Sequence, residues 1–192
     1  MTEEVLTRET LPLPAARTTA QNALVLAWAS RIDASIGVLG RLAAWLTLLL
    51  VALVAGDVIA RYVWHVGSVA EQQLEWHVLA VIAMLSASFT LQQDEHVRVD
   101  IFYRNYSPRA RRILDTLVYL LVVVPTSAFI AVSSVHFVVQ SYRLHEGSVT
   151  PGGLPDLFIL KAFVPLGFAL VSLEALALGV REWLGPVQQE KE

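Results

Sequence analysis

Four long apolar segments separated by polar connections dominate the pattern of this chain. They run from about residue 38 to 61, 74 to 91, 113 to 142 and 158 to 183. A helix rises about 1.5 Å per residue, so a segment of this length crosses the ~30 Å hydrocarbon core of a bilayer. The pattern therefore predicts an all-α membrane protein with four transmembrane helices.

The composition agrees with a membrane protein and excludes several kinds of chemistry. Hydrophobic residues make up 55% and charged residues 16% of the 192 residues, and the mean hydropathy is +0.56. The absence of cysteine excludes disulfides, thiolate metal sites and cysteine nucleophiles. No phosphate-binding loop, dinucleotide fingerprint, metal-binding helix motif or nucleophile elbow occurs. We therefore expect neither an enzyme nor a cofactor-binding protein.

Residues 21–36, which precede the first apolar segment, have the pattern of an amphipathic helix. Apolar residues recur at every fourth position, at Leu24, Trp28, Ile32 and Ile36. We expect this helix to lie along the inner membrane surface. The alternative is that it extends the first span.

The positive charges predict the orientation in the membrane. Eleven of the fourteen Lys and Arg residues lie in the tails, at the inner ends of spans or in the basic loop at 91–112. Such an excess marks the cytoplasmic face, so both termini are predicted to be cytoplasmic. We divide the chain into a flexible tail at 1–20, the amphipathic helix, a membrane domain at 37–185 and a tail at 186–192. The membrane surface explains the basic loop better than nucleic acid does.

Charged residues near the outer ends of the first two spans are candidates for structural or interface roles. Asp57 and Arg61 are four residues apart on one helix face, which predicts an ion pair. Glu75, followed by Trp76, lies just inside the second span, where an unpaired carboxylate is costly. We expect Glu75 to meet a partner on another helix or subunit, or else to reach the membrane surface.

Other positions predict how the spans pack. Small residues recur along the second span, which we expect to be the packed, central helix. Ser107 and Pro108 predict the start of the third helix, and Pro125 predicts a kink near its middle. Glu174 is isolated inside the fourth span, and Arg41 is its expected partner.

Each of the two longer connections carries a predicted local structure. In the inner loop, Arg98 and Asp100 are expected to form an ion pair, with a fully solvated loop as the alternative. In the outer connection, Gly152 and Gly153 predict a shaped turn, because glycine adopts backbone conformations that other residues resist.

One alternative function has a geometric basis. His77 and His136 lie at similar predicted depth on the second and third spans. Two histidines on facing helices of a membrane bundle can hold a b-type haem. Histidines in membranes also bond across helices or sit at interfaces, so both interpretations stay open.

Short motifs occur in a characteristic order along the chain. They are ARYVW, EQQLEWH, LQQDEHVRVDIFY, SPRARR, TPGGLPDL and LKAFVPLGF. HVRVD, which begins at His96, is fairly specific in combination with the SPR at 107–109. Over residues 38–183 the chain resembles the small membrane subunit of tripartite ATP-independent periplasmic (TRAP) transporters, the DctQ-like family.

The resemblance implies an inner-membrane protein that pairs with a large, multi-span DctM-like permease subunit. A soluble DctP-like periplasmic binding protein would deliver the substrate, which we expect to be an organic acid. In that family the large subunit carries the sodium and substrate sites, and the small subunit enlarges the fixed scaffold. The resemblance also implies that Glu75 and Trp76 touch the large subunit and that the outer loops border the docking surface for the binding protein. A b-type cytochrome subunit and an accessory assembly protein remain the alternatives.

Overall fold

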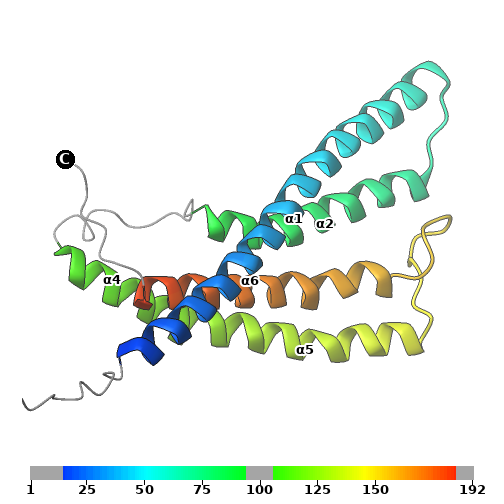
Figure 1. Ribbon diagram of the computed structural model, residues 1–192. Helices are drawn as coiled ribbons and strands as arrows, with labels where there is room; N and C mark the ends of the chain where they lie inside the picture. Colours follow the sequence, from blue (N-terminus) through cyan, green and yellow to red (C-terminus); the bar gives the residue numbers. More distant parts are fainter. Residues whose placement is uncertain (1–14, 94–105, 185–192) are drawn as a thin grey trace, which may run out of the picture.

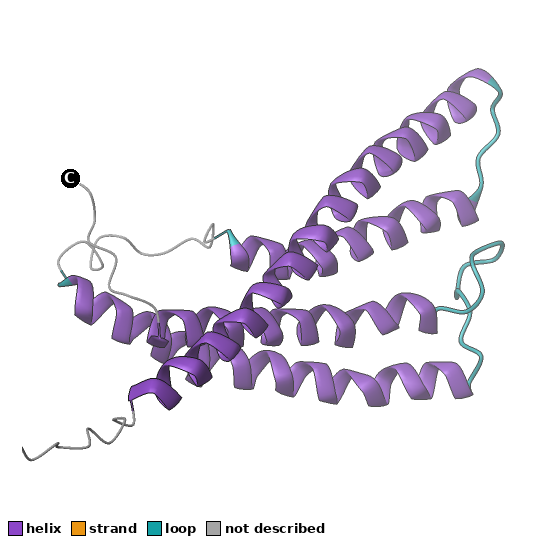
Figure 2. Cartoon of the chain, viewed as in Figure 1, coloured by secondary structure: helices purple, strands orange, loops and turns teal. Residues whose placement is uncertain are grey.

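The described part of the chain, residues 15–93 and 106–184 of the computed structural model, is built of helices joined by short connections (Figures 1 and 2). In chain order the elements are α1 (Ala15–Val63), α2 (Val69–Gln92), α4 (Pro108–Leu117), the π-helical η1 (Val118–Val123), α5 (Val124–Arg143) and α6 (Phe158–Leu184). Because α4, η1 and α5 follow one another without a break, the described residues form four helical segments long and apolar enough to cross a membrane. The predicted all-α architecture with four transmembrane helices is confirmed.

Two helices begin at serine caps. The Ser68 hydroxyl accepts a hydrogen bond from the Glu71 backbone N–H at 3.4 Å, at the start of α2. The Ser107 hydroxyl accepts one from the Ala110 N–H at 3.3 Å, at the start of α4. The first N–H groups of a helix have no partner within the helix, so these hydroxyls favour a start at the edge of the apolar run. The start predicted at Ser107 is confirmed.

Helix α1 is longer than predicted. Its 49 residues form one continuous helix, which at about 1.5 Å per residue extends about 74 Å. Residues 21–36 are therefore the N-terminal part of α1 and not a separate helix, and residues 15–20 of the predicted flexible tail are helical as well. The physical reason is that no proline interrupts the sequence from 15 to 63. The alternative interpretation, an extension of the first span, is the one observed.

The face that α1 buries also differs from the predicted stripe. Ala29, Ile36, Gly40 and Ala43 are buried, and steps of seven, four and three residues keep them on one side of a helix. Residues four apart drift by about 40° per step at 3.6 residues per turn. The predicted stripe therefore winds off the buried face, and Leu24 is 72% exposed.

The central helix is α6, and the prediction that the second span is central was wrong. Helix α6 packs against α1, α2, α4, η1 and α5, and in Figure 1 it lies between α2 and α5. Four of its five buried positions are small, namely Gly167, Ala175, Ala177 and Gly179, and the fifth is Glu174. A Cβ atom at Gly167 would lie 3.0 Å from the backbone oxygen of Met84 on α2. Glycine therefore allows the two backbones to approach closely, which is how helices associate where lipid gives no hydrophobic drive.

The kink predicted at Pro125 corresponds to a π-helical turn just before it. The Val124 N–H donates to the carbonyl of Tyr119, five residues back, and Pro125 has no N–H to donate. The Ser127 hydroxyl donates to the Val123 carbonyl at 2.6 Å, and the Ser172 hydroxyl of α6 reaches the Val124 carbonyl at 3.4 Å. These hydroxyls add hydrogen-bond donors to two carbonyls at the junction of η1 and α5.

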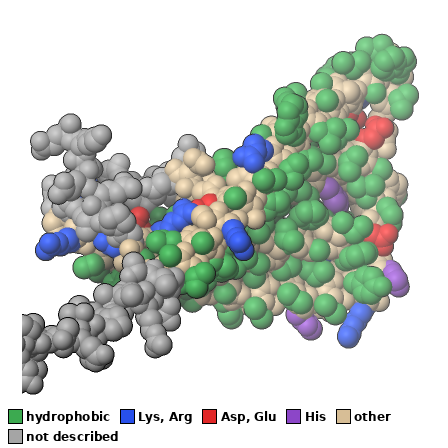
Figure 3. All heavy atoms as spheres, viewed as in Figure 1, with side chains coloured by type: hydrophobic (Ala, Val, Ile, Leu, Met, Phe, Trp, Pro, Cys, Tyr) green, Lys and Arg blue, Asp and Glu red, His purple; other side chains and the backbone are tan. Residues whose placement is uncertain are grey.

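Helix α1 separates from the other helices toward one end of the bundle. We call this end, with the connections at 64–68 and 144–157, the outer end, and the opposite end the inner end. In Figure 1 the outer half of α1 leans away from α2, α6 and α5. Large apolar side chains on the outer half of α1 are exposed, including Trp45, Leu48, Val51, Ile59 and Tyr62. In the described part of the face seen in Figure 3, hydrophobic side chains are spread over the helices and charged ones are few, so the surface suits lipid or a membrane partner.

Candidate functional site

A cleft with a volume of about 250 Å³ opens between the outer halves of α1 and α2. We call it the outer cleft; it is lined by Ala52, Leu53, Gly56, Asp57, Ala60, Glu71, Leu74 and Glu75. The two helices are joined by the short 64–68 connection. Asp57 lies six residues before the end of α1, and Glu75 lies six residues after the start of α2. The two carboxyl groups therefore sit at similar depth on facing helices.

The predicted Asp57–Arg61 ion pair is confirmed. Arg61 Nη2 lies 2.7 Å from Asp57 Oδ2, and the Asp57 side chain is only 10% exposed. The second carboxyl oxygen, Asp57 Oδ1, is buried and has no hydrogen-bond partner. One carboxyl oxygen of Asp57 is thus paired within its own helix, and the other oxygen is not.

Glu75 has no pairing partner in the described part of the chain. Its Oε1 atom is buried without a hydrogen bond, and Glu75 forms no ion pair with a described residue. The neighbouring Trp76 is 68% exposed. A structural pair with another described helix, one of the predicted outcomes, is therefore not found, whereas a partner on another subunit stays a prediction.

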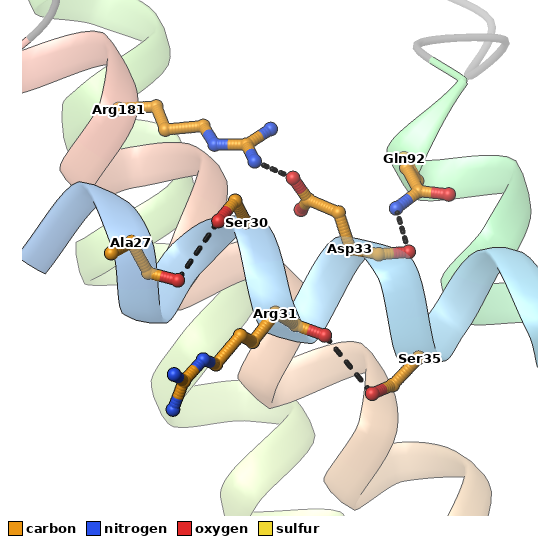
Figure 4. Close-up of polar contacts among 7 residues, drawn as sticks. All are labelled: Ala27, Ser30, Arg31, Asp33, Ser35, Gln92 and Arg181. Carbon is orange, nitrogen blue, oxygen red and sulfur yellow. Dashed lines mark hydrogen bonds and ion pairs between the residues drawn. The ribbon is translucent and has the colours of Figure 1, made fainter.

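A second polar cluster connects three helices near the inner end. This inner polar junction consists of Asp33 on α1, Gln92 on α2, and Glu174 and Arg181 on α6. Arg181 forms an ion pair with Asp33 Oδ2, and Gln92 Nε2 donates to the Asp33 carbonyl at 2.9 Å (Figure 4). In the same view the Arg31 side chain points away from this junction. The junction joins α1 to both α2 and α6.

Glu174 is fully buried, and the prediction that Arg41 pairs with it was wrong. Neither Glu174 carboxyl oxygen has a hydrogen-bond partner in the described part of the chain. Gln92 is close to Glu174 but does not meet the geometry of a hydrogen bond. Arg41 is exposed, and its Nη1 atom lies 3.8 Å from the Cβ position of Gly37, one turn back along α1. Arg41 and Glu174 were predicted to lie at similar depth, but the Arg41 side chain does not lie on the side of α1 that meets Glu174.

Loss of the Asp33–Arg181 pair should loosen the inner end. The side chains are 16% and 36% exposed, respectively, so Asp33→Ala and Arg181→Ala should each cost about 1–2 kcal/mol of unfolding free energy. Exchanging the charges, with Asp33→Arg and Arg181→Asp together, should recover part of this loss. Melting temperatures in detergent test the prediction, with Arg31→Ala as the matched control. Equal effects of Arg31→Ala and Arg181→Ala would contradict it.

The outer connection contains the shaped turn that its glycines predicted. The Gly153 N–H donates to the Thr150 carbonyl at 3.0 Å, and Gly152 has a φ of +79°. With Pro151 at the second position, this is the geometry of a type II turn. A Cβ at Gly153 would lie 2.4 Å from the Ser148 hydroxyl. Both glycines are therefore required by the local structure.

The Gln73 side chain fastens this connection to α2. Its Nε2 atom donates to the Ser148 hydroxyl at 2.5 Å, and its Oε1 atom accepts from the Leu154 N–H at 2.7 Å. At the other side, Lys161 of α6 forms an ion pair with Glu146 and lies 4.0 Å from the centre of the Phe137 ring. The outer connection is thus held by two helices at once.

The Glu146–Lys161 pair makes the outer connection sensitive to acid. The hydrogen bond from Lys161 holds the pKa of Glu146 below its ordinary value of 4.5. The pair therefore contributes fully above pH 4.5, and its contribution is lost as the pH falls through the lower folded-state pKa. Wild type should melt higher than Glu146→Gln at neutral pH, and the difference should close as the pH falls below 4.5. Melting curves across this range test it, and a difference independent of pH would contradict it.

The comparisons with known proteins identify the family. The family model for tripartite ATP-independent periplasmic transporters, DctQ component, matches residues 50–185. The match covers more than two thirds of the chain and includes the outer cleft and Glu174. The chain belongs to the DctQ family. It is the small membrane subunit of a TRAP transporter, a multi-pass component of the inner membrane. No curated protein and no solved structure gives a significant match.

The haem alternative lacks the geometry it needs in this DctQ subunit. His77 lies on α2, where its Nδ1–H donates to the Gln73 carbonyl at 2.6 Å. His136 is exposed on α5, and α6 lies between α2 and α5 (Figure 1). The alternative in which His77 and His136 hold a haem between facing helices is therefore not supported, because α6 separates their helices.

Some predicted residues cannot be placed and some observed ones were not predicted. His96, Arg98, Asp100 and the tail at 186–192 lie outside the described residues. The polar side chains of the DctQ subunit that sequence reasoning missed are Asp33, Gln73, Gln92, Arg112, Glu146 and Arg181. Arg112 donates to the carbonyls of Glu182 and Trp183 at the end of α6. A search for polar residues within one turn of a helix end would have found most of this group.

Proposed function

We propose that this DctQ subunit is a scaffold for a large DctM-like permease subunit during ion-gradient-driven uptake. The family match over residues 50–185 carries this proposal. The exposed apolar surface on the outer half of α1 supports it, since such a surface suits a membrane partner as well as lipid. The scaffold role would be to enlarge the fixed part of the permease against which the transporting part moves.

The distribution of charges supports assigning the transport sites to the large subunit. Carriers usually have several ionisable groups inside the membrane, or broken helices in repeated halves. Among the described residues, Glu174 is the only carboxylate fully buried in a span. We infer that the substrate, an organic acid, and the coupling ion bind to the large subunit.

The outer connection is proposed to border the docking surface for a DctP-like binding protein. Val149 stands fully exposed there, while Gln73 and Lys161 hold the base of the connection in place. A firmly held connection with an exposed apolar tip suits transient docking. This proposal requires the outer end to face the periplasm, with both termini in the cytoplasm, as the charge distribution predicts.

Uptake measurements in the native cells test the proposed function. A strain lacking this chain should lose ionophore-sensitive uptake of at least one organic acid from a panel of labelled acids. A plasmid copy should restore it. A copy carrying Glu182→Gln, an exposed carboxylate at the inner end, should restore it equally. Unchanged uptake of every acid that wild type takes up by an ionophore-sensitive route would contradict the proposal.

A further inference from the structure

We propose that the outer cleft receives a lysine or arginine side chain from a membrane helix of the large subunit. The inference rests on the proposed function, because it names what this surface of the DctQ subunit binds in its partner. It follows from the charge, burial and shape of the cleft between α1 and α2.

The first observation is a pair of buried carboxyl oxygens without partners. Asp57 is nine-tenths buried, and its Oδ1 atom lacks a hydrogen bond. Glu75 Oε1, on the facing helix, also lacks one. Each residue lies six positions from its helix end, or about 9 Å along the helix. An unsatisfied carboxylate at such a depth in a membrane is costly, so a donor from outside this chain is expected.

The second observation is an excess of negative charge. The cleft is lined by three carboxylates, those of Asp57, Glu71 and Glu75. Arg61 is the cation nearest to them in sequence, and its guanidinium is already paired with Asp57 Oδ2. No lysine or arginine of the described residues lines the cleft itself. The unbalanced charge therefore calls for a cation.

The shape of the cleft favours a long basic side chain. Apart from the carboxylates, its lining is apolar or small, formed by Ala52, Leu53, Gly56, Ala60 and Leu74. Gly56 is part of the lining, and a Cβ there would have nothing within 4 Å, so the space beside it is open. Lysine and arginine combine an apolar stem with a cationic head, which matches apolar walls beside carboxylates.

A metal ion fits the site less well. Among the described residues, no three His, Cys, Asp or Glu side chains are placed so that they could hold a metal ion together, and this includes the three carboxylates of the cleft. A hard cation takes six or more oxygen ligands, and the cleft offers too few. A partner side chain needs only two or three hydrogen bonds, which the free oxygens of Asp57 and Glu75 can accept.

The test compares neutral variants in the assembled complex. The tagged DctQ subunit is purified with its large subunit in a mild detergent, and the dissociation constant is measured from a dilution series. Glu75→Gln and Asp57→Asn should each weaken the complex by about thirtyfold, the low end for loss of one member of a buried charge pair. The matched control Glu182→Gln should leave the constant unchanged. Each variant should elute from size exclusion as wild type does when purified alone.

A cross-linking experiment tests the same site without changing a carboxylate. The chain has no cysteine, so Gly56→Cys can carry a photo-reactive label in the lining of the cleft. The label should join a peptide of the large subunit that has a lysine or arginine within one helical turn. Replacing that residue by glutamate should weaken the complex, and adding Glu75→Lys should restore it.

The outcomes separate this inference from the proposed function. If wild type recovers no large subunit, the scaffold proposal fails and the cleft proposal fails with it. If wild type recovers the large subunit and the neutral variants bind it equally well, only the cleft proposal is overturned. Cross-links exclusively to lipid, or to a partner segment without a basic residue, would also overturn it.

Discussion

Gly167→Leu should lower the free energy of unfolding of the isolated subunit by about 3 kcal/mol. Any Cβ at position 167 would lie 3.0 Å from the Cβ and backbone oxygen of Met84 and 3.3 Å from its Cα. The oxygen and Cα belong to the main chain of α2, and the Cβ is bonded directly to it. None of these atoms can therefore move away by a side-chain rotation. Because α6 is the central helix, moving α2 disturbs the whole bundle. Thermal unfolding in detergent, followed by the near-ultraviolet dichroism of the tryptophans, measures the loss.

Gly56→Leu is the matched control for this variant. Gly56 also lies within a long membrane helix, but a Cβ there would have no neighbour within 4 Å. The isolated subunit should therefore tolerate leucine at this position within about 0.5 kcal/mol. If the two variants unfolded at the same temperature, close packing of α6 on α2 would not be what stabilises the bundle.

Glu174→Met should raise the free energy of unfolding by about 1–3 kcal/mol. Glu174 is fully buried, and neither of its carboxyl oxygens has a hydrogen-bond partner among the described residues. Methionine has a similar length and shape but no polar group to desolvate. The melting temperature of the purified subunit measures the gain, and Glu182→Met, on an exposed position of the same helix, should change it little.

A gain and a loss of stability in Glu174→Met would have different meanings. A gain in stability with reduced uptake would mean that the carboxyl group is retained for transport rather than for folding. A loss of more than about 1 kcal/mol would contradict the prediction, because it would require a favourable contact to Glu174.

Local chemistry explains what could be predicted from the sequence. The spans follow from apolar length alone, and the start at Ser107 follows from the needs of helix N-termini. The Asp57–Arg61 pair and the turn at Gly152 depend only on residues within four positions of one another. Such features depend mainly on neighbouring residues and little on how the helices pack, so the structure and the predictions agree.

Tertiary arrangement explains what could not be predicted. Lipid-facing and protein-facing apolar residues look alike in a membrane sequence, so small residues on the second span suggested the wrong central helix. The deciding contacts, such as that of Gly167 with Met84, join residues 83 positions apart. The partners of Asp33 and the lack of a partner for Glu174 depend likewise on how α1, α2 and α6 cross. The sequence indicates how deep a residue lies along its span, but it does not indicate toward which neighbour the side chain points around the helix axis.

The central claim is that this DctQ subunit acts as the scaffold of a TRAP permease. The most direct test is native mass spectrometry of the tagged protein purified gently from its own membrane, with a visible spectrum of the same sample. The account predicts a stable complex with one large multi-span subunit and no haem absorbance. Recovery of the chain alone, or with haem and electron-transfer proteins, would contradict it.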